Sequence, residues 1–395
     1  MVIAGETSGD MLAAELVKTL RAELMAEYRY SDDLQPLHAD LAPRFFGAGG
    51  QRMAAAGVEL EFDMTSHAVT GLWEVLRKYR KFKQLFDRLY QLALEREPHA
   101  IICVDFSGFN RRFASAIKKH VRSQRGTFNN WNPKIIQYVS PQVWASRPGR
   151  AYTMPAAYDL LLSIFPFEKD WYASRVPKLH VEFVGHPIID RYATFLPQPA
   201  TETSHASSPL VLLLPGSRPG EVKRHLPVLC DSLRKLRAAI PGICARMVLP
   251  EESLVQQAKA MGLPADLEVR LSSLAESLSR ADLAIASTGT VTMECAYFGV
   301  PTVALYKTSW PTYQIGKRLI TVKYMAMPNL LANEEIFPEF LQDTATAENI
   351  SRAALELLRD ETRRNTIKAK LKEIITSLGN TGASQRATEA IIRTL

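Results

Sequence analysis

The sequence lacks any apolar run close to the ~18 residues that a membrane-spanning helix needs, and no signal peptide precedes its first predicted strand. Its four cysteines, in a chain of 395 residues, show no CxxC pair and no other zinc-ligand spacing. Two of them lie inside apolar strand-like segments, and a reducing cytosol fits this pattern. We therefore expect buried free thiols at the cysteines, which are Cys103, Cys230, Cys244 and Cys295.

Metal-binding patterns are also missing. No DxD-like pair and no His/Asp cluster with metal-ligand spacing occurs, and Asp32 and Asp33 lie in a polar loop. The sequence therefore predicts no metal and no other cofactor. The net charge of +7 and the pI near 9.1 instead indicate an anionic partner, either nucleic acid or an anionic membrane surface. Nucleic acid is disfavoured because no RNP, helix-turn-helix or zinc-finger pattern accompanies the charge.

The positive charge is concentrated in two stretches. Five of the seven residues at 77–83 are Lys or Arg, and they lie on a predicted helix, 72–94, with an apolar stripe. This pattern favours an amphipathic helix at a membrane surface, and the alternative is a core helix with a solvated basic face. The second stretch, 111–125, has six Lys or Arg and no acidic residue. The expected membrane contacts are Arg77, Lys78, Arg80, Lys81, Phe82 and Lys83.

Apolar strand-like segments alternate with helical patterns along the chain, which is typical of parallel α/β sheets. Residues 196–209, rich in Pro, Ser and Thr, form the best linker. We therefore predict an N-terminal domain, 1–195, and a C-terminal domain, 210–370. The predicted strands are 2–4, 44–46, 99–104, 134–139, 158–164 and 181–184 in the first half, and 210–214, 245–249, 268–271, 282–286 and 302–305 in the second.

Each half contains Gly-punctuated turns between a strand and a helix. Residues 2–10 run from an apolar strand into a turn and then a helical pattern. In the second half, 210–214 lead into 215–218, and 286–290 open a helix that stops at Gly299. Turns of this kind expose backbone N–H groups at helix N-termini, which suits them to diphosphates. The pattern predicts two nucleotide-fold domains that face one cleft.

Ten motifs occur in order along the chain. They are GETSGD at 5–10, FFGAGGQRM at 45–53, VTGLWEVL at 69–76, VDFSGFN at 104–110, QYVSPQVWASRPGR at 137–150, FPFEKDWY at 165–172, FVGHP at 183–187, LLLPGSRPGEV at 212–222, STGTVTMECAYFGVPTV at 287–303 and MPNLLA at 327–332. Together they resemble lipid-A-disaccharide synthase, a family of bacterial inverting glycosyltransferases. Two departures are Gln51, where the family usually has proline, and 123–133, which look like an insertion.

The resemblance covers nearly the whole chain and implies the GT-B fold, in which two Rossmann-like domains face an interdomain cleft. It also implies that residues 371–395 pack back toward the N-terminal domain. The implied reaction transfers 2,3-diacylglucosamine from its UDP conjugate to the 6-hydroxyl of 2,3-diacylglucosamine 1-phosphate (lipid X). The products are the β-1′,6-linked lipid A disaccharide 1-phosphate and UDP. The implied location is cytoplasmic, at the inner membrane of a Gram-negative bacterium, where the N-terminal domain meets its lipid substrates.

Two other functions remain open at the level of sequence. A UDP-sugar 2-epimerase uses the same double fold and a similar ribose-binding glutamate, but it has no need of a basic amphipathic helix. A non-catalytic nucleotide-binding membrane adaptor would keep the nucleotide site without a catalytic acid. The oligomeric state is also open, a homodimer included.

The candidate nucleotide site lies in the second half. Arg218 offers a permanent, forked cation for the leaving diphosphate, and the alternative is an ordinary turn with an exposed arginine. Glu294 lies one turn into the helix that begins near Thr290, where its carboxylate can accept the ribose hydroxyls. The resemblance places Asn329 on the donor side, and the alternative is a structural turn asparagine. The full set is Gly216, Ser217, Arg218, Ser287, Thr288, Gly289, Thr290, Glu294 and Asn329.

The candidate base is Asp105, which ends an apolar strand and matches the family's proposed catalytic aspartate. Apolar neighbours should raise the pKa of its carboxyl toward a useful value, and the alternative is a helix N-cap. His186 is a weaker rival base. Gly5, Ser8 and Gly9 are expected to contact the acceptor through backbone N–H groups and the Ser8 hydroxyl.

Overall fold

The computed structural model describes residues 1–30, 42–64, 72–124, 126, 129–196 and 208–395. They form two compact α/β units, Met1–Asp190 with Asn380–Leu395, and Arg191–Gly379. The predicted linker, 196–209, lies largely outside the described residues. The chain leaves the first unit after Asp190, a few residues before the boundary that the sequence suggested.

The first unit is built on a seven-stranded parallel sheet in the order β3-β2-β1-β4-β5-β6-β7. The order reverses between β1 and β4, and in such sheets ligands bind at the carboxyl ends of the two strands beside this switch point. The strands are β1 (Val2–Ala4), β2 (Phe46–Gly49), β3 (Glu59–Asp63), β4 (Ala100–Val104), β5 (Lys134–Tyr138), β6 (Leu160–Ser163) and β7 (Val181–Phe183).

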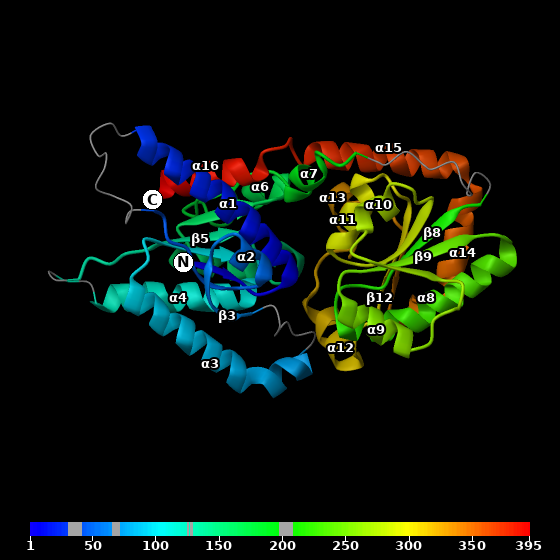
Figure 1. Ribbon diagram of the computed structural model, residues 1–395, viewed down its shortest axis with the longest axis horizontal. Helices are drawn as coiled ribbons and strands as arrows, with labels where there is room; N and C mark the ends of the chain where they lie inside the picture. Colours follow the sequence, from blue (N-terminus) through cyan, green and yellow to red (C-terminus); the bar gives the residue numbers. More distant parts are fainter. Residues whose placement is uncertain (31–41, 65–71, 125, 127–128, 197–207) are drawn as a thin grey trace. The chain divides into compact units, whose positions relative to one another are not determined.

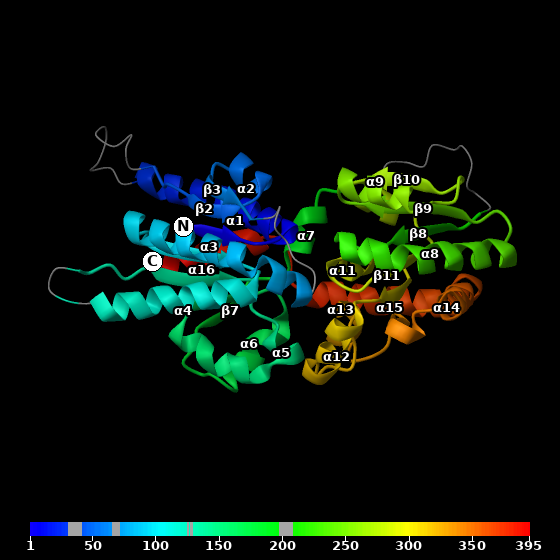
Figure 2. The ribbon, with the colours of Figure 1, turned by 90° about the horizontal axis from the view of Figure 1, so that it is seen from below.

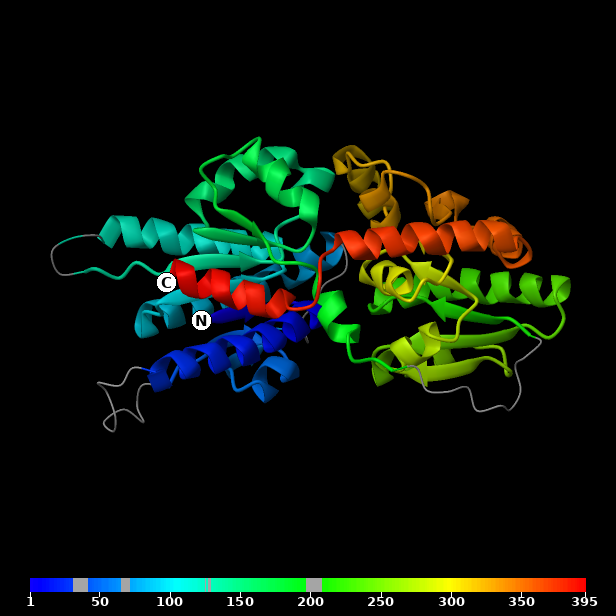
Figure 3. The same cartoon turned by 90° about the horizontal axis from the view of Figure 1, so that it is seen from above.

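Helices cover both faces of this sheet. Figure 1 shows α1 and α16 on one face and α3 and α4 on the other, and Figure 3 shows α16 running beside α1. The helices of this unit are α1 (Thr7–Tyr30), α2 (Gln51–Ala55), α3 (Leu72–Arg96), α4 (Ser107–Gln124), α5 (Val143–Ser146), the 3₁₀ helix η3 (Pro148–Ala156), α6 (Pro166–Ala173), the start of α7 (Pro187–Tyr192) and α16 (Ala383–Thr394).

The second unit repeats the same arrangement with a six-stranded parallel sheet, β10-β9-β8-β11-β12-β13, whose order reverses between β8 and β11. The strands are β8 (Leu210–Leu214), β9 (Cys244–Leu249), β10 (Glu268–Leu271), β11 (Leu283–Ser287), β12 (Thr302–Tyr306) and β13 (Glu339–Leu341). The helices are α8 (Pro219–Ala239), α9 (Glu252–Ala260), α10 (Leu274–Leu278), α11 (Thr290–Tyr297), α12 (Trp310–Leu319), α13 (Met327–Ala332), η4 (Gln342–Thr344), α14 (Ala347–Arg359) and α15 (Glu361–Ser377).

The C-terminal segment is divided between the two units. Leu371 and Ile374 of α15 belong to the core of the second unit, whereas α16 belongs to the first. The carboxylate of Asp190 accepts hydrogen bonds from the backbone N–H groups of Gly382 (2.5 Å) and Ser384 (3.2 Å). It therefore caps the start of α16. Residues 380–395 alone, rather than all of 371–395, join the N-terminal unit.

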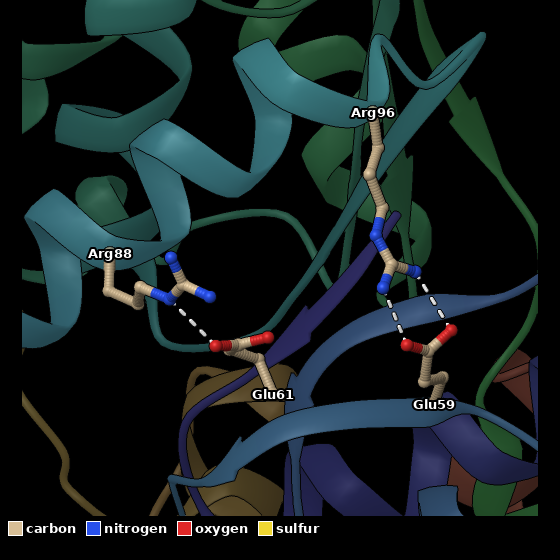
Figure 4. A network of polar contacts seen from close by, with 4 residues as sticks. All are labelled: Glu59, Glu61, Arg88 and Arg96. Carbon is tan, nitrogen blue, oxygen red and sulfur yellow. Dashed lines mark hydrogen bonds and ion pairs between the residues drawn. The ribbon is translucent and has the colours of Figure 1, made fainter.

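The second half of the basic helix α3 packs against the core of the first unit. In its second half, Leu89 is fully buried and the Phe86 ring contacts Phe109 and Phe113 of α4, so this half is a core helix. Figure 4 shows the other side of this half, where Arg88 pairs with Glu61, and Arg96 forms a two-pronged pair with Glu59 on the edge strand β3. The side chains of Arg77, Lys78 and Lys81 lie outside the described residues, whereas Arg80 and Lys83 are exposed and Phe82 is half-buried.

The cysteine prediction holds in part. All four thiols are free, and Cys103 and Cys295 are buried, but Cys230 and Cys244 are only half-buried. No helix among the described residues is both long and apolar enough to cross a bilayer. In the apparent insertion at 123–133, the Trp131 indole donates to the carbonyl oxygen of Pro98 at 3.1 Å. The described end of this segment is therefore anchored to the domain.

Candidate active site

The turn after β4 carries the predicted base, and its backbone is strained. Asp105 has a φ of +50° and Phe106 a φ of +43°. Residues with a Cβ rarely adopt this left-handed conformation, and each such residue costs on the order of 1–3 kcal/mol. Strain of this size persists only where the surroundings enforce it. The fold therefore holds Asp105, which is half-buried, in one position at the end of β4.

Two buried amides enforce this conformation. Nδ2 of Asn110 and Nε2 of Gln137 donate to the carbonyl oxygen of Asp105 at 2.8 and 3.0 Å. The N–H of Asp105 donates to the carbonyl oxygen of Tyr138 at 2.9 Å. Nε2 of Gln137 also lies 3.2 Å from the carbonyl oxygens of Tyr138 and Val139, which share its second N–H, and Val139 has a φ of +63°. The strained ends of β4 and β5 are thus fastened together by one side chain.

The predicted acceptor loop lies against this turn. A Cβ on Gly5 would come within 2.3 Å of the Phe106 ring, so only glycine allows the ring to cover the loop. A Cβ on Gly9 would lie 3.6 Å from the Cβ of Asp105. Ser8 is half-buried in the first turn of α1, where N–H groups have no intrahelical partners. The structure therefore brings Gly5, Ser8, Gly9 and Asp105 together at the β1/β4 switch point.

Asp10, the last residue of this loop, has a structural role. Its buried carboxylate accepts hydrogen bonds from the N–H groups of Gly50 (2.7 Å), Arg52 (3.1 Å) and Met53 (3.1 Å). It caps the start of α2, where a negative charge is favoured by the helix dipole. The charge of Asp10 is therefore engaged at α2.

Glu168 is a second carboxylate at the carboxyl ends of these strands, and the sequence analysis did not single it out. It is fully buried and accepts hydrogen bonds from the Ser140 hydroxyl (2.5 Å) and the Trp144 indole (2.9 Å). Burial raises the pKa of Glu168 to about 7, although both hydrogen bonds lower it. The motifs at 137–150 and 165–172 are thus joined by a buried hydrogen-bonded cluster.

His186, the rival base, is 7% exposed, and its Nδ1 accepts a hydrogen bond from the N–H of Ile188 at 3.2 Å. Its ring contacts the ring of Phe165, with centroids 5.4 Å apart. This arrangement favours a role in starting α7 over a role as base.

In the second unit, the turn after β8 carries Gly216, Ser217 and Arg218. Gly216 has a φ of +118°, and a Cβ there would lie 2.4 Å from Oε2 of Glu221. That carboxylate accepts a hydrogen bond from the Ser217 N–H at 3.1 Å and lies 3.7 Å from the Arg218 guanidinium. Glu221 therefore engages both groups expected to hold the diphosphate.

His225 fixes the position of this turn. It is fully buried, its Nδ1 lies 2.6 Å from the carbonyl oxygen of Pro215, and its Nε2 accepts from the N–H of Lys307 at 2.9 Å. Because Nε2 accepts, the proton lies on Nδ1 and the ring is neutral. Burial lowers the pKa of His225, which keeps it neutral. The β8 turn is therefore tied to the end of β12.

The turn after β11 places Ser287, Thr288, Gly289 and Thr290 on the other side of the β8/β11 switch point. Ser287 is buried at the end of the strand, whereas Gly289 and Thr290 are exposed. Gly289 has a φ of +140° and is the N-cap residue of α11. The glycine allows the turn to form without strain and leaves the helix N-terminus accessible.

Glu294, on α11, has partners that sequence reasoning missed. Its Oε1 accepts a hydrogen bond from the Tyr192 hydroxyl at 2.8 Å and lies 3.5 Å from Nη1 of Arg191. The side chain is 13% exposed, and burial raises the pKa of Glu294. Both contacts use Oε1. Arg191 and Tyr192, the first two residues of the second unit, therefore orient the Glu294 carboxylate.

Asn329 is fully buried, and its amide is engaged within the protein. Nδ2 donates to the carbonyl oxygen of Phe337 and to Oε1 of Glu339, both at 2.7 Å. Oδ1 accepts from the N–H groups of Ile336 (2.9 Å) and Phe337 (2.8 Å). The geometry therefore favours the structural alternative over direct nucleotide contact, because no donor position of the amide is left for a ligand.

Comparison with known proteins identifies the family. The family model for lipid-A-disaccharide synthetase matches residues 1–393. The lipid-A-disaccharide synthase of Geobacter sulfurreducens is 34% identical over 403 aligned residues, covering 100% of this chain and 97% of that protein. This chain belongs to the lipid-A-disaccharide synthase family. It is a glycosyltransferase of lipid A biosynthesis.

Solved structures of other families share the fold of this synthase-family chain. A calicheamicin glycosyltransferase superposes with a TM-score of 0.58 at 13% identity, covering 100% of this chain and 96% of that one. The UDP-GlcNAc 2-epimerase from Neisseria meningitidis, bound to UDP-GlcNAc, gives 0.58 at 12% identity over 96% of each chain. These likenesses confirm the GT-B class, two Rossmann-like units, and the fold alone would not separate a transferase from an epimerase.

Among the described residues, no group of three or more His, Cys, Asp or Glu side chains is arranged to hold a metal ion. The residues that sequence reasoning missed are Asn110, Gln137, Glu168, Arg191, Tyr192, Glu221 and His225. A signal exists for one of them, because Gln137 is the only polar residue in the apolar strand segment 135–139.

Proposed function

We propose that this chain transfers 2,3-diacylglucosamine from its UDP conjugate to the 6-hydroxyl of 2,3-diacylglucosamine 1-phosphate, with inversion at the anomeric carbon. The products are the β-1′,6-linked disaccharide 1-phosphate and UDP. The observation that carries the proposal is the contact between the GETSGD loop and the strained Asp105 turn at the switch point of a chain from this family.

Asp105 is the proposed general base. Its carboxylate takes the proton of the acceptor 6-hydroxyl while that oxygen forms a bond to the anomeric carbon of the donor. The bond from this carbon to the diphosphate oxygen breaks, and its electron pair stays on UDP. The clamped backbone favours this role, because a base must be held in line with the reacting hydroxyl. Gly5, Ser8 and Gly9 lie beside it and contact the acceptor.

Arg218 is the proposed group that stabilises the charge of the leaving diphosphate, assisted by the N–H groups at the starts of α8 and α11. Gly216, Ser217 and residues 287–290 shape this phosphate site. Glu221 pairs with Arg218 and accepts a hydrogen bond from the Ser217 N–H. Binding of UDP therefore requires the Glu221 carboxylate to give up these contacts, since two anions would repel each other.

Glu294 is the proposed ribose ligand, and Tyr192 and Arg191 hold its carboxylate in place. Asn329 supports the donor side indirectly, by fixing the segment from Ile336 to Glu339. We propose that no metal takes part, because Arg218 and the helix N-termini supply positive charge to the diphosphate. Dialysis against EDTA should then leave the rate unchanged, and restoration of a lost rate by Mg²⁺ would contradict this part.

Association with an anionic membrane surface is proposed for the cytoplasmic side of the inner membrane, through the first half of α3. The exposed Arg80 and Lys83 support it, and each such cation gains about 1 kcal/mol near an anionic leaflet. Changing Arg77, Lys78, Arg80, Lys81 and Lys83 to Gln should release the protein from anionic vesicles. A matched control is Lys368→Gln with Lys372→Gln on the exposed face of α15. If the five-fold variant sediments with anionic vesicles as well as wild type does, these five cations form only a solvated helix face.

The experiment that tests the function is incubation of purified protein with both acyl sugars, followed by mass spectrometry. The expected result is the disaccharide 1-phosphate and an equal amount of UDP. A product with the mass of the donor would instead indicate epimerisation. If no product forms from either sugar, the chain would be a nucleotide-binding protein without catalytic activity.

A further inference from the structure

Four arginines of the first unit gather beside the turn that carries Asp105. Arg111 and Arg112 lie in the second turn of α4, and Arg147 and Arg150 lie at the start of η3. The function proposed above assigns no role to any of them. Arg112 is exposed, and the other three are half-buried.

The packing of α4 against η3 brings these residues together. Near the ends of the two helices, Nη2 of Arg122 donates to the carbonyl oxygen of Ala156 at 2.9 Å. Nearer the beginnings of the two helices, the Arg150 guanidinium is close enough to those of Arg111 and Arg112 for their charges to lower its pKa. The two helices therefore pack against each other, and Figure 2 shows α5, which leads into η3, near the beginning of α4.

The charges of this cluster are not balanced within the described part of the chain. Residues 106–158 contain no Asp or Glu. No acidic side chain among the described residues forms an ion pair with any of the four arginines. Burial, and then repulsion from Arg147, Arg111 and Arg112, lowers the pKa of Arg150. Four mutually repelling cations are stabilised when an anion binds among them.

The chemistry of the cluster fits a phosphate group. Guanidinium groups donate in forked pairs to phosphate oxygens, and several of them together match the charge of a phosphate monoester. Arg111 lies four residues beyond Ser107, about 6 Å along the helix axis from the start of α4. The cluster is thus within reach of a sugar whose hydroxyl lies at Asp105.

We propose that these arginines bind the phosphate of the acceptor, so that the sugar spans from Asp105 to the cluster. This inference rests on the proposed function, because it takes the acceptor to be a sugar phosphate. The start of α1 is the competing place, but it offers only neutral donors and carries Glu6 and Asp10. The arginine cluster offers permanent positive charge, and it accounts for a preference for phosphorylated acceptors.

Binding tests the proposal without any turnover. Calorimetry in detergent would compare 2,3-diacylglucosamine 1-phosphate with the same sugar lacking its phosphate. Wild type should favour the phosphorylated form, and Arg147→Gln with Arg150→Gln should reduce that preference by about tenfold to a hundredfold. Lys119→Gln, an exposed cation on α4, is the matched control and should keep the preference.

Single variants keep the test decisive if the double variant unfolds. Arg112→Gln, at an exposed position, should lose part of the preference, and Arg150→Lys should retain more of it than Arg150→Gln. The proposal is overturned if Ser8→Ala loses the preference for the phosphorylated sugar while the arginine variants keep it. The phosphate would then bind at the start of α1. The proposal also fails if the arginine variants lose only binding to anionic vesicles, because the cluster would then recognise lipid headgroups.

Rates of transfer distinguish a failure of this inference from a failure of the proposed function. With wild type, transfer to the phosphorylated acceptor should exceed transfer to the dephosphorylated one, and the arginine variants should make the two rates similar by lowering only the first. An equal loss on both acceptors would contradict a phosphate site. Failure of wild type to transfer to either acceptor would refute the proposed function, while the calorimetric preference would still decide the role of the cluster.

Discussion

The two switch points reach similar geometry by different means. In the second unit, Gly216 and Gly289 adopt the positive φ values that the turns require, and glycine does so without strain. In the first unit, Asp105 and Phe106 adopt positive φ although both carry side chains. The difference shows what each turn supplies. Under the proposed function, the turns of the second unit offer backbone N–H groups to a phosphate, for which glycine suffices, whereas the turn of the first unit presents a catalytic side chain and retains the strain.

The means of support differ in the same way. Gln137 and Asn110 clamp the carbonyl oxygen of Asp105 in the first unit. In the second unit, the neutral imidazole of His225 ties the β8 turn to the end of β12. Amide clamps hold a strained conformation that would otherwise relax, whereas the histidine only positions a turn that glycine already permits.

The largest expected effect comes from the first switch point. Asp105→Asn should keep the fold and the affinity for UDP but lose transfer by ~10²–10⁴-fold, because the base is gone. The measurement is the initial rate between roughly pH 6 and 9. Asp87→Asn, an exposed carboxylate on α3, is the control. Near wild-type turnover in Asp105→Asn would reassign Asp105 to a capping role.

The next effect separates two residues of the second switch point. Arg218→Ala should lower turnover by roughly 10²–10³-fold, because charge stabilisation in the transition state is lost. Glu294→Ala should mainly raise the donor KM, because its contacts exist in the ground state and the transition state alike. Calorimetry with UDP checks both. Unchanged UDP affinity in both variants would contradict a nucleotide site in this unit.

A third effect concerns Glu168, the buried carboxyl of the first unit whose pKa is raised to about 7. The native state keeps its proton up to a pH of about 7, whereas the unfolded chain loses it near 4.5. The native state therefore binds more protons in this window, and stability falls as the pH rises from 4.5 to 7, by about 3 kcal/mol. Denaturation at several pH values should show this fall in wild type but not in Glu168→Gln. Equal pH profiles would show that the buried carboxyl titrates normally.

The sequence alone predicts most of the strands and the glycine-containing turns that follow them. The apolar runs predicted ten of the strands to within two residues at both ends, because a buried parallel strand needs a continuous apolar segment. An eleventh, β2, was predicted at 44–46, and its end lies three residues further along the chain. The strands that were missed, β3 and β13, lie at sheet edges, where acidic residues interrupt the apolar pattern. The turns 5–10, 215–218 and 286–290 were placed by their glycines.

The supports of these turns could not be predicted. Gln137 acts on a carbonyl that is 32 residues away in the chain, and Tyr192 reaches Glu294 across 102 residues. Such pairs exist only once the sheets have formed. Asn329 was expected on the donor side, but its amide is buried in the fold. The strain at Asp105 was invisible as well, because no glycine in the sequence marks that position.

The most direct test of the strain argument compares two substitutions that both remove the carboxylate. Asp105→Gly and Asp105→Ala should both lose transfer, and their free energies of unfolding isolate the backbone effect. We predict that the Gly variant is more stable than the Ala variant by roughly 1 kcal/mol, because glycine adopts the positive φ without strain. At Gly216, where a Cβ would meet Glu221, Gly216→Ala should instead destabilise the fold. An Ala variant at Asp105 that is as stable as the Gly variant, or one that retains transfer, would contradict the claim that this strain is kept for catalysis.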